Sequence, residues 1–252
     1  MKRIQFLGTS KFKVGILVGV VLFTSSAFNS QFAAASATEV STAHGAMTFE
    51  FPDVVYDASG DCINPSFNAD VKSFVPQGDW YVDITIRKNG ESPTGSNGRA
   101  MGTSAGPSVG TIQICPNLDG AGTFIVDGVF TTFDNGPSYS NLEKKFISSV
   151  NVRKGQSTLV LDSIKRKGSN ISLSGNVKGS SEKYGMVGLS GTVRVDYQLK
   201  NSTKWLALTA VYTGKSGTYK ISVTRKLPEK ILFRVKFIET NTVETSEIKK
   251  VA

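Results

Sequence analysis

The sequence predicts an all-β protein in which an N-terminal signal peptide precedes two antiparallel β-sandwich domains. Three observations lead to this prediction. Short apolar alternations of period two recur along the chain, and turns rich in glycine, serine and asparagine separate them. The balance of charge also changes sign abruptly near the middle of the chain. Helical periodicity is nearly absent after the N-terminal segment, which favours sandwiches over mixed folds.

The first residues have the pattern of a secretory signal peptide. A basic region precedes an apolar or small-residue run from Val14 to Phe28, and Ala35 and Ala37 fit the small-residue positions of a cleavage site. The strongly apolar part ends near Phe23, short of the roughly 20 residues that a membrane-spanning helix needs. We therefore expect cleavage after Ala37 and no transmembrane segment in the mature chain. We expect the protein to be secreted, either released or held at the cell envelope.

The distribution of charge predicts two domains. Residues 38–150 contain 6 lysines and arginines against 13 aspartates and glutamates, whereas residues 151–252 contain 19 against 7. Net charges of −7 and +12 suit two separate surfaces better than one. We expect a signal peptide at 1–37, a polar lead-in at 38–46, an acidic domain at 47–153 and a basic domain at 154–252.

The acidic half contains one especially clear strand. Trp80, Val82, Ile84 and Ile86 alternate with polar residues, and the pair 89–90, Asn-Gly, then supplies a turn. Similar alternation predicts further strands at Phe67 to Val71, Ile112 to Ile114, Phe124 to Phe130 and Phe146 to Val152. The stretch 89–109 is rich in glycine, serine and proline and has no large aromatic residue, so we expect it to be a long flexible loop.

The basic half shows the same alternation, at Ile171 to Val177, Val193 to Leu199 and Leu206 to Val211. Residues 216–237 predict a β-hairpin whose outward face carries Lys220, Arg234 and Lys236. In a domain of net charge +12 these three residues are a candidate surface for an anionic ligand. A solvated basic face, or one neutralised by the acidic half, would explain the same charges.

Several motifs resemble immunoglobulin-like domains. Cys62, Trp80 and Cys115 stand in the Cys, Trp, Cys order of that family, and the stretch DGAGTFIV at 119–126 is similar to its Asp-x-Gly-x-Tyr motif. In the second half, TVRVDYQLKNSTKWLAL and SGTYKISV resemble the immunoglobulin-like and fibronectin-type-III-like modules of secreted actinobacterial proteins. The resemblance implies two immunoglobulin-like sandwiches and implies no single activity.

The two cysteines predict a disulfide. An exported chain matures in an oxidising compartment, where two cysteines normally pair, so we expect a bond between Cys62 and Cys115. A free catalytic thiol is the alternative, but His44, the one histidine of the sequence, lies in the polar lead-in and is a poor candidate for a general base.

Other catalytic and metal chemistry has little support in the sequence. We expect no cofactor, because a zinc site normally needs several histidine or cysteine ligands. Paired carboxylates for a glycosidase and a calcium site that uses some of Asp53, Asp57 and Asp61 stay open as alternatives, although no D-x-D-x-D-G loop is present. We therefore expect no enzymatic activity.

The sequence thus predicts an exported protein that works by contact at or outside the cell surface. Its partner would be a protein or a cell-envelope polymer, with no specific nucleic acid. Carbohydrate binding is an alternative because sandwiches can present aromatic platforms, and a secreted inhibitor is another. The candidate platform residues are Trp80, Tyr81, Tyr184, Trp205 and Tyr212, of which alternation turns Tyr81 outward.

Overall fold

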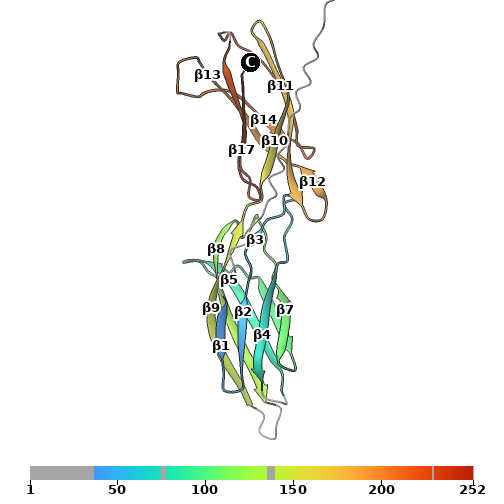
Figure 1. Ribbon diagram of the computed structural model, residues 1–252, viewed down its shortest axis with the longest axis vertical. Helices are drawn as coiled ribbons and strands as arrows, with labels where there is room; N and C mark the ends of the chain where they lie inside the picture. Colours follow the sequence, from blue (N-terminus) through green and yellow to red (C-terminus); the bar gives the residue numbers. More distant parts are fainter. Residues whose placement is uncertain (1–36, 75–77, 135–139, 229, 252) are drawn as a thin grey trace, which may run out of the picture. The chain divides into compact units, whose positions relative to one another are not determined.

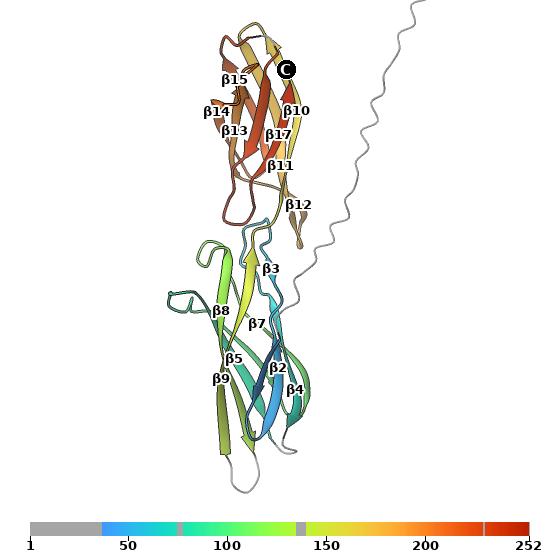
Figure 2. The same cartoon turned by 60° about the vertical axis from the view of Figure 1, so that its left-hand side comes forward.

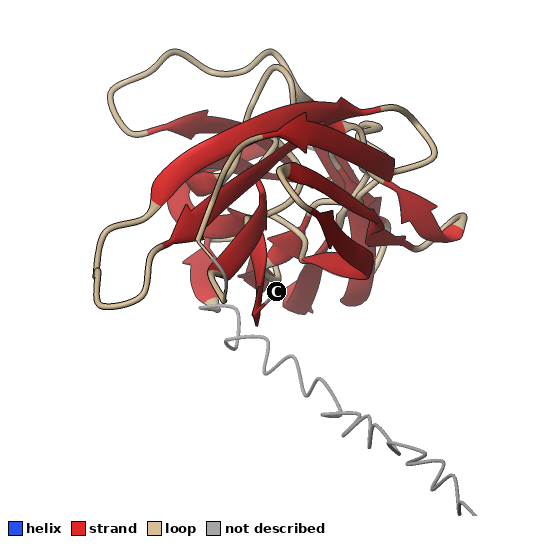
Figure 3. Ribbon diagram, turned by 90° about the horizontal axis from the view of Figure 1, so that it is seen from above, coloured by secondary structure: helices blue, strands red, loops and turns tan. Residues whose placement is uncertain are grey.

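The computed structural model describes residues 37–74, 78–134, 140–228 and 230–251. All regular elements in these ranges are β-strands (Figure 3), and nearly all pair antiparallel, which confirms the all-β prediction. The predicted signal peptide, apart from its last residue, lies outside the described residues. None of the described residues forms a helix of the length and apolar character needed to span a membrane.

Nine strands form one hydrogen-bonded sheet in the order β1-β2-β4-β7-β6-β5-β8-β9-β3. Figure 1 labels these strands except β6. Their bounds are β1 Thr38–Ser41, β2 Gly45–Glu50, β3 Val54–Val55, β4 Ser66–Phe74, β5 Trp80–Lys88, β6 Asn97–Gly102, β7 Gly106–Thr111, β8 Gly122–Asp134 and β9 Ser140–Arg153. Only one residue pair, Arg99 with Thr111, joins β6 to β7. The sheet turns a corner at this pair, and its two layers enclose a core that includes Phe49, Phe67 and Trp80.

Strand β6 and most of β7 lie within the segment 89–109, so the prediction of a long flexible loop is wrong. Their glycines are the reason that sequence patterns missed them. A Cβ at Gly110 would lie 2.2 Å from Cζ of Phe67, and one at Gly102 would lie 2.7 Å from Cζ2 of Trp80. The core rings thus press directly on the backbone of β6 and β7, and these strands need glycine for close packing rather than for a turn.

The segment 38–46, predicted as a lead-in, is also a structural part of the first sheet. Residues 38–41 form the edge strand β1, and a turn closed by Thr42 leads into β2. His44 lies in this turn, where its backbone N–H donates to Oγ1 of Thr42. The first sandwich therefore begins at the predicted cleavage site rather than nine residues after it.

Eight further strands form two four-stranded sheets (Figure 2). Their bounds are β10 Ser157–Lys167, β11 Asn170–Ser181, β12 Gly185–Gly188, β13 Gly191–Gln198, β14 Leu206–Thr213, β15 Thr218–Thr224, β16 Leu232–Phe237 and β17 Ser246–Val251. In one sheet β11 pairs with β10 on one side and with β12 and β15 on the other. The other sheet has the order β14-β13-β16-β17. Inward residues of both sheets, among them Leu173 and Phe233, form a second core.

The residues 216–237 do not form the predicted hairpin. Strand β15 pairs with β11, whereas β16 pairs with β13 and β17. Alternation located both strands and their inward faces correctly, but it carries no information about which strand each one joins. Tyr219 and Phe233 belong to opposite layers of the second core rather than to one face of a hairpin.

The two cores divide between β9 and β10, where the charge of the sequence also changes sign. The first core draws on residues 40–152, and the second draws on 159–243 together with Ala58. The described residues nevertheless belong to one compact unit. That each half folds as an independent domain stays a prediction.

Candidate binding surfaces

The three cations predicted as one anionic-ligand surface are not brought together by the fold. Lys220 projects from β15 on the outer face of the sheet β10-β11-β15, and it is exposed. Arg234 and Lys236 project from β16 on the outer face of the opposite sheet. A single ligand surface built on all three residues therefore does not exist in this structure.

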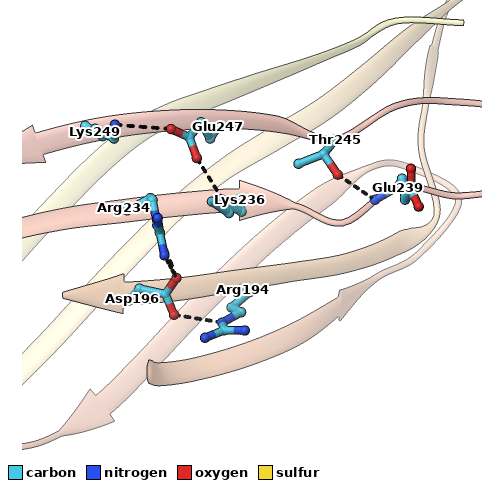
Figure 4. A network of polar contacts seen from close by, with 8 residues as sticks. All are labelled: Arg194, Asp196, Arg234, Lys236, Glu239, Thr245, Glu247 and Lys249. Carbon is cyan, nitrogen blue, oxygen red and sulfur yellow. Dashed lines mark hydrogen bonds and ion pairs between the residues drawn. The ribbon is translucent and has the colours of Figure 1, made fainter. Parts of the chain in front are cut away.

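Arg234 takes part in a network around a buried carboxylate, Asp196 (Figure 4). Nη2 of Arg234 donates to Oδ2 of Asp196 at 2.7 Å, and Nε of Arg194 donates to Oδ1, also at 2.7 Å. The Asp196 side chain is 1% exposed. The Arg234 guanidinium lies over the ring of Trp205, 4.3 Å from its centre, so the planar cation is held on two sides. This arrangement fits a structural ion network better than a site for an incoming anion.

The pKa of Asp196 lies below its ordinary value. Burial opposes ionisation and by itself raises the pKa, but the hydrogen bonds from Arg234 and Arg194 lower it by more. A carboxyl whose pKa is depressed on folding stabilises the protein above its unfolded pKa, and this stabilisation is lost as pH falls through the folded pKa.

We expect Asp196→Asn to lower the free energy of unfolding by about 2 kcal/mol at neutral pH, because it leaves two cations without their buried counter-charge. The difference from the native chain should shrink as pH falls below about 4, where the carboxyl becomes protonated first in the unfolded state and, at lower pH, in the folded state. Urea unfolding at several pH values measures this. Glu247→Gln, at a more exposed pair, is the control and should change stability by about 0.5 kcal/mol. A constant difference from pH 7 down to pH 2 would contradict the expectation.

Lys236 is also paired with an acid. Its Nζ lies 3.0 Å from Oε2 of Glu247, and Nζ of Lys249 lies 3.3 Å from Oε1 of the same side chain. The hydrogen bond from Lys236 and the one from Lys249 hold the pKa of Glu247 below its ordinary value. The outer face of β13, β16 and β17 therefore carries interleaved charges of both signs (Figure 4).

A different set of cations gathers around Lys220. Register places Ser222 beside Ser172 and Lys165, and places Lys220 beside Ser174 and Ser163. Lys167 follows on the same outward face, and all three lysines are exposed. Within the described ranges no carboxylate lies at ion-pair distance from their amines. We call this outer face of β10, β11 and β15, with Lys165, Lys167 and Lys220 among serines, the lysine face.

Two of the three carboxylates considered for calcium, Asp53 and Asp57, accept hydrogen bonds from the protein itself. Asp53 accepts hydrogen bonds from the backbone and side-chain amides of Asn151. Asp57 accepts from the backbone N–H groups of Ser59 and Glu182. Burial acts to raise the pKa of Asp57, but hydrogen bonds from the Ser59 backbone, the Ser181 and Ser59 hydroxyls and the Glu182 backbone together lower it by more. Within the described residues, no group of three histidine, cysteine or acidic side chains is placed to hold a metal ion.

The predicted disulfide is confirmed. Cys62 and Cys115 are bonded across a sequence separation of 53 residues. The turn after Cys115 is closed by Asp119, whose carboxylate accepts from the Cys115 backbone N–H at 2.6 Å. Tyr56 donates its hydroxyl proton to the carbonyl of Gly120 beside this turn, and burial followed by the nearby Asp119 charge raises its pKa to about 12.

The aromatic residues considered as a carbohydrate platform are dispersed. Trp80 is buried in the first core, and Trp205 is covered by Arg234. Tyr184 and Tyr212 are exposed, at 56% and 70%. Tyr81 points outward as predicted, but the Arg99 guanidinium lies over its ring at 4.6 Å and Phe133 packs against it at 5.4 Å. Both neighbours restrict the access of a flat ligand to this ring.

Tyr81 belongs to a larger outward surface on strands β6, β5, β8 and β9. Register aligns the outward positions in rows across the four strands: Met101, Tyr81, Thr131 and Glu143; Arg99, Asp83, Val129 and Lys145; Asn97, Thr85, Asp127 and Ile147. Thr131 occupies one of these positions but is itself buried. Two hollows, of about 790 and 400 Å³, lie along this surface, and Arg99 lines both. We call the three rows, together with Phe133, the groove face.

The groove face combines exposed apolar groups with fixed charges. Met101 is 62% exposed and Ile147 is 68% exposed. Between them, Arg99 donates through Nε and Nη2 to the two carboxylate oxygens of Asp83 at 2.5 and 2.7 Å. A bidentate pair of this kind holds the guanidinium in one orientation, which presents its plane beside Tyr81.

Sequence patterns identified only part of the groove face. Alternation in β5 and β8 correctly turned Tyr81 and Asp83 outward. Arg99 and Met101 were missed because they lie in the segment 89–109 that was expected to be a loop. The exposed Ile147, which breaks the rule of polar outward residues on β9, was the one local signal of a surface that could contact a partner.

Comparisons with known proteins give no family assignment. No protein-family model matches the chain, and no curated protein sequence matches it. Among solved structures, red sea bream transglutaminase matches 84% of this chain and 31% of its own, at 8% identity and a TM-score of 0.38. The native conformation of Escherichia coli alpha-2-macroglobulin covers 88% of this chain and 14% of its own, at 12% identity and a TM-score of 0.27. A multidomain fragment of titin covers 85% and 67%, at 14% identity and a TM-score of 0.25.

The chain thus spans less than a third of the first two proteins, and at these TM-scores none of the three similarities carries an inference about activity. The fold itself is established by strand order and pairing: the chain is an all-β protein of antiparallel sheets.

Proposed function

We propose that this protein is an exported, non-enzymatic binding module that works at or outside the cell surface, and that its groove face contacts a protein partner. The observation that carries the proposal is the groove face itself. Export is supported by the N-terminal signal pattern and by the Cys62–Cys115 disulfide, since such bonds persist in oxidising compartments.

The composition of the groove face favours a protein over a carbohydrate. Aromatic residues, methionine and arginine are enriched in protein interfaces, and Tyr81, Met101, Arg99 and Phe133 lie together here. A sugar ring would stack on a free aromatic face, whereas Arg99 and Phe133 already pack against Tyr81. The fixed Arg99–Asp83 pair offers charges of both signs to polar groups at the rim of a protein interface.

The test compares one double variant with a control at another exposed apolar position. Met101→Glu combined with Ile147→Glu places charge at two exposed apolar positions of the groove face, and we expect affinity for the partner to fall at least about tenfold. Val109→Glu is the control, because Val109 is 61% exposed on β7 in the opposite layer. The measurement is recovery of binding proteins from culture supernatant and envelope, followed by titration of each purified candidate.

A partner recovered equally by the double variant would contradict the assignment to the groove face. Failure of the native protein to recover any reproducible partner would contradict protein binding as the function. Turnover of a polymer by the pure protein would contradict the non-enzymatic assignment.

A second candidate function is binding of an anionic polymer, and the lysine face favours it. Lys165, Lys167 and Lys220 lie among hydroxyl groups, with no carboxylate at ion-pair distance in the described structure, in a half of the chain with net charge +12. We expect low-salt retention on anionic vesicles or teichoic acid to be lost in the triple serine variant at these positions. Lys236→Ser with Lys249→Ser, on the charge-balanced face, should keep most of it. Retention that does not change with salt would contradict this candidate.

A further inference from the structure

Strand β14 is a long sheet edge without charged residues, and β15 of the other sheet lies close to it. It is the outer strand of the sheet β14-β13-β16-β17, and its eight residues, LALTAVYT, include no charged residue and no proline. The other edges of the described sheets are protected, because β1, β3 and β12 have four residues or fewer. Strand β10 has a bulge and several charges, β15 carries Lys220, and β17 carries Glu247, Lys249 and Lys250. Long uncharged edges of this kind are templates for strand addition.

The pairing of β13 shows which backbone groups of β14 face outward. Ile238 donates its backbone N–H to the carbonyl of Thr192, so Thr192 and the alternate residues of β13 direct their backbone groups toward β16. The intervening residues, Val193 among them, therefore bond to β14, at Val211 and its alternates. It follows that the N–H and C=O groups of Ala210 and Tyr212 point away from the sheet.

One contact supports this orientation independently. A bulge between Ala207 and Thr209 shifts the alternation by one residue, so that the Ala207 carbonyl points outward, and Nη1 of Arg225 donates to it at 3.4 Å. The uninterrupted stretch from Thr209 to Thr213 has no such partner. Within the described residues no hydrogen bond reaches the outward groups of Ala210 or Tyr212.

The charges at the two ends of β14 indicate what would pair with it. Arg225 lies at the Ala207 end, and Lys215 is exposed just beyond the Thr213 end. Two copies of β14 paired antiparallel about Val211 would bring Lys215 of one copy opposite Ala207, and hence Arg225, of the other. This repulsion disfavours a second copy and favours a strand with acidic residues at its ends.

We propose that β14 binds an extended, acid-flanked segment of another protein by strand addition. The segment bonds to the backbone of Ala210 and Tyr212, and its terminal carboxylates face Lys215 and Arg225. A segment of about seven residues would span β14 from the Ala207 end to the Thr213 end, with β-branched residues in the middle of the segment. This site is distinct from the groove face and does not depend on the proposed function.

The test uses a synthetic peptide of five alternating valines and threonines with a glutamate at each end, carrying a fluorophore for anisotropy. Ala210→Pro removes an outward N–H that takes no part in pairing with β13, and we expect it to weaken binding about fivefold or more. Ala210→Val keeps the N–H and is the matched control, with affinity within about twofold of native. Circular dichroism and urea unfolding confirm that both variants fold.

Charge reversal provides the second arm. Lys215→Glu should weaken the glutamate-flanked peptide and strengthen a lysine-flanked one, and the native affinity for the glutamate-flanked peptide should fall as salt rises. Equal binding by both Ala210 variants would overturn the proposal, as would no binding by the native protein. Self-association that Ala210→Pro abolishes, measured by sedimentation, would identify a second copy as the occupant and would also overturn it.

Discussion

Gly128→Val should destabilise the protein by about 3 kcal/mol, at the upper end of what overpacking a core normally costs. Gly128 lies in the middle of β8, directly opposite Phe146 of β9. A Cβ at this position would lie 2.1 Å from Cζ and 2.3 Å from Cε1 of the Phe146 ring, which crosses the strand over the glycine. The ring has little freedom to move aside, because it is also packed against Phe49 with 5.0 Å between ring centres.

A double-mutant cycle separates this clash from a general loss of strand stability. Phe146→Ala alone should cost about 3 kcal/mol by leaving a cavity. In the double variant, the new valine occupies part of that cavity, so the two effects should fall short of additivity by more than about 1 kcal/mol. Urea unfolding followed by the fluorescence of Trp80, in the same core, measures each value. Strictly additive effects would mean that Gly128 is required for another reason.

The same relation between ring and glycine explains which strands could be predicted from the sequence. Where side chains alternate, as from Trp80 to Ile86, the inward positions were assigned correctly because each residue carries its own apolar signal. In β6 and β7 the inward positions include Gly98 and Gly110, and the apolar volume comes from Phe67, about 30 or more residues earlier in the chain. When a ring from a distant residue fills the space beside a strand glycine, the sequence around that glycine lacks an apolar residue at the inward position and resembles the sequence of a turn.

The candidate surfaces show a similar division between local and distant information. Alternation correctly placed Arg234 and Lys236 on an outward face, but it could not show that the Asp196 carboxylate lies beneath Arg234, since their pairing joins residues 38 positions apart. Asp196 also has an outward position in β13, where a charged residue normally indicates exposure, yet two arginines bury it. Net charge predicted a surface that attracts anions. The pairing of individual charges distinguishes the lysine face, whose lysines have no acidic partner at ion-pair distance in the described structure, from the face of β13, β16 and β17, where cations and carboxylates are paired.

Loss of the disulfide should have an effect of similar or greater size. In the chain-entropy model, a bond that closes a loop of 53 residues stabilises by about 4 kcal/mol, a large part of the roughly 5–15 kcal/mol available to a folded protein. The bond fixes the segment before β4 to the turn after β7, beside the backbone pairing of Ile63 with Ile114. We expect Cys62→Ser with Cys115→Ser to lower the free energy of unfolding of the first core by about 4 kcal/mol, seen as a lower urea midpoint.

Three comparisons identify the bond as the cause. The native protein in reducing agent should unfold like the double serine variant, and the reducing agent should not affect that variant. Hydrogen exchange should accelerate first in the turn 115–120, where Asp119 and Tyr56 depend on the position of Cys115. The urea midpoint of the second core, followed by Trp205, should stay unchanged if the two halves unfold independently. A lower midpoint in both cores would show that the first core stabilises the second. Equal stability of oxidised and reduced native protein would contradict the expected role of the bond.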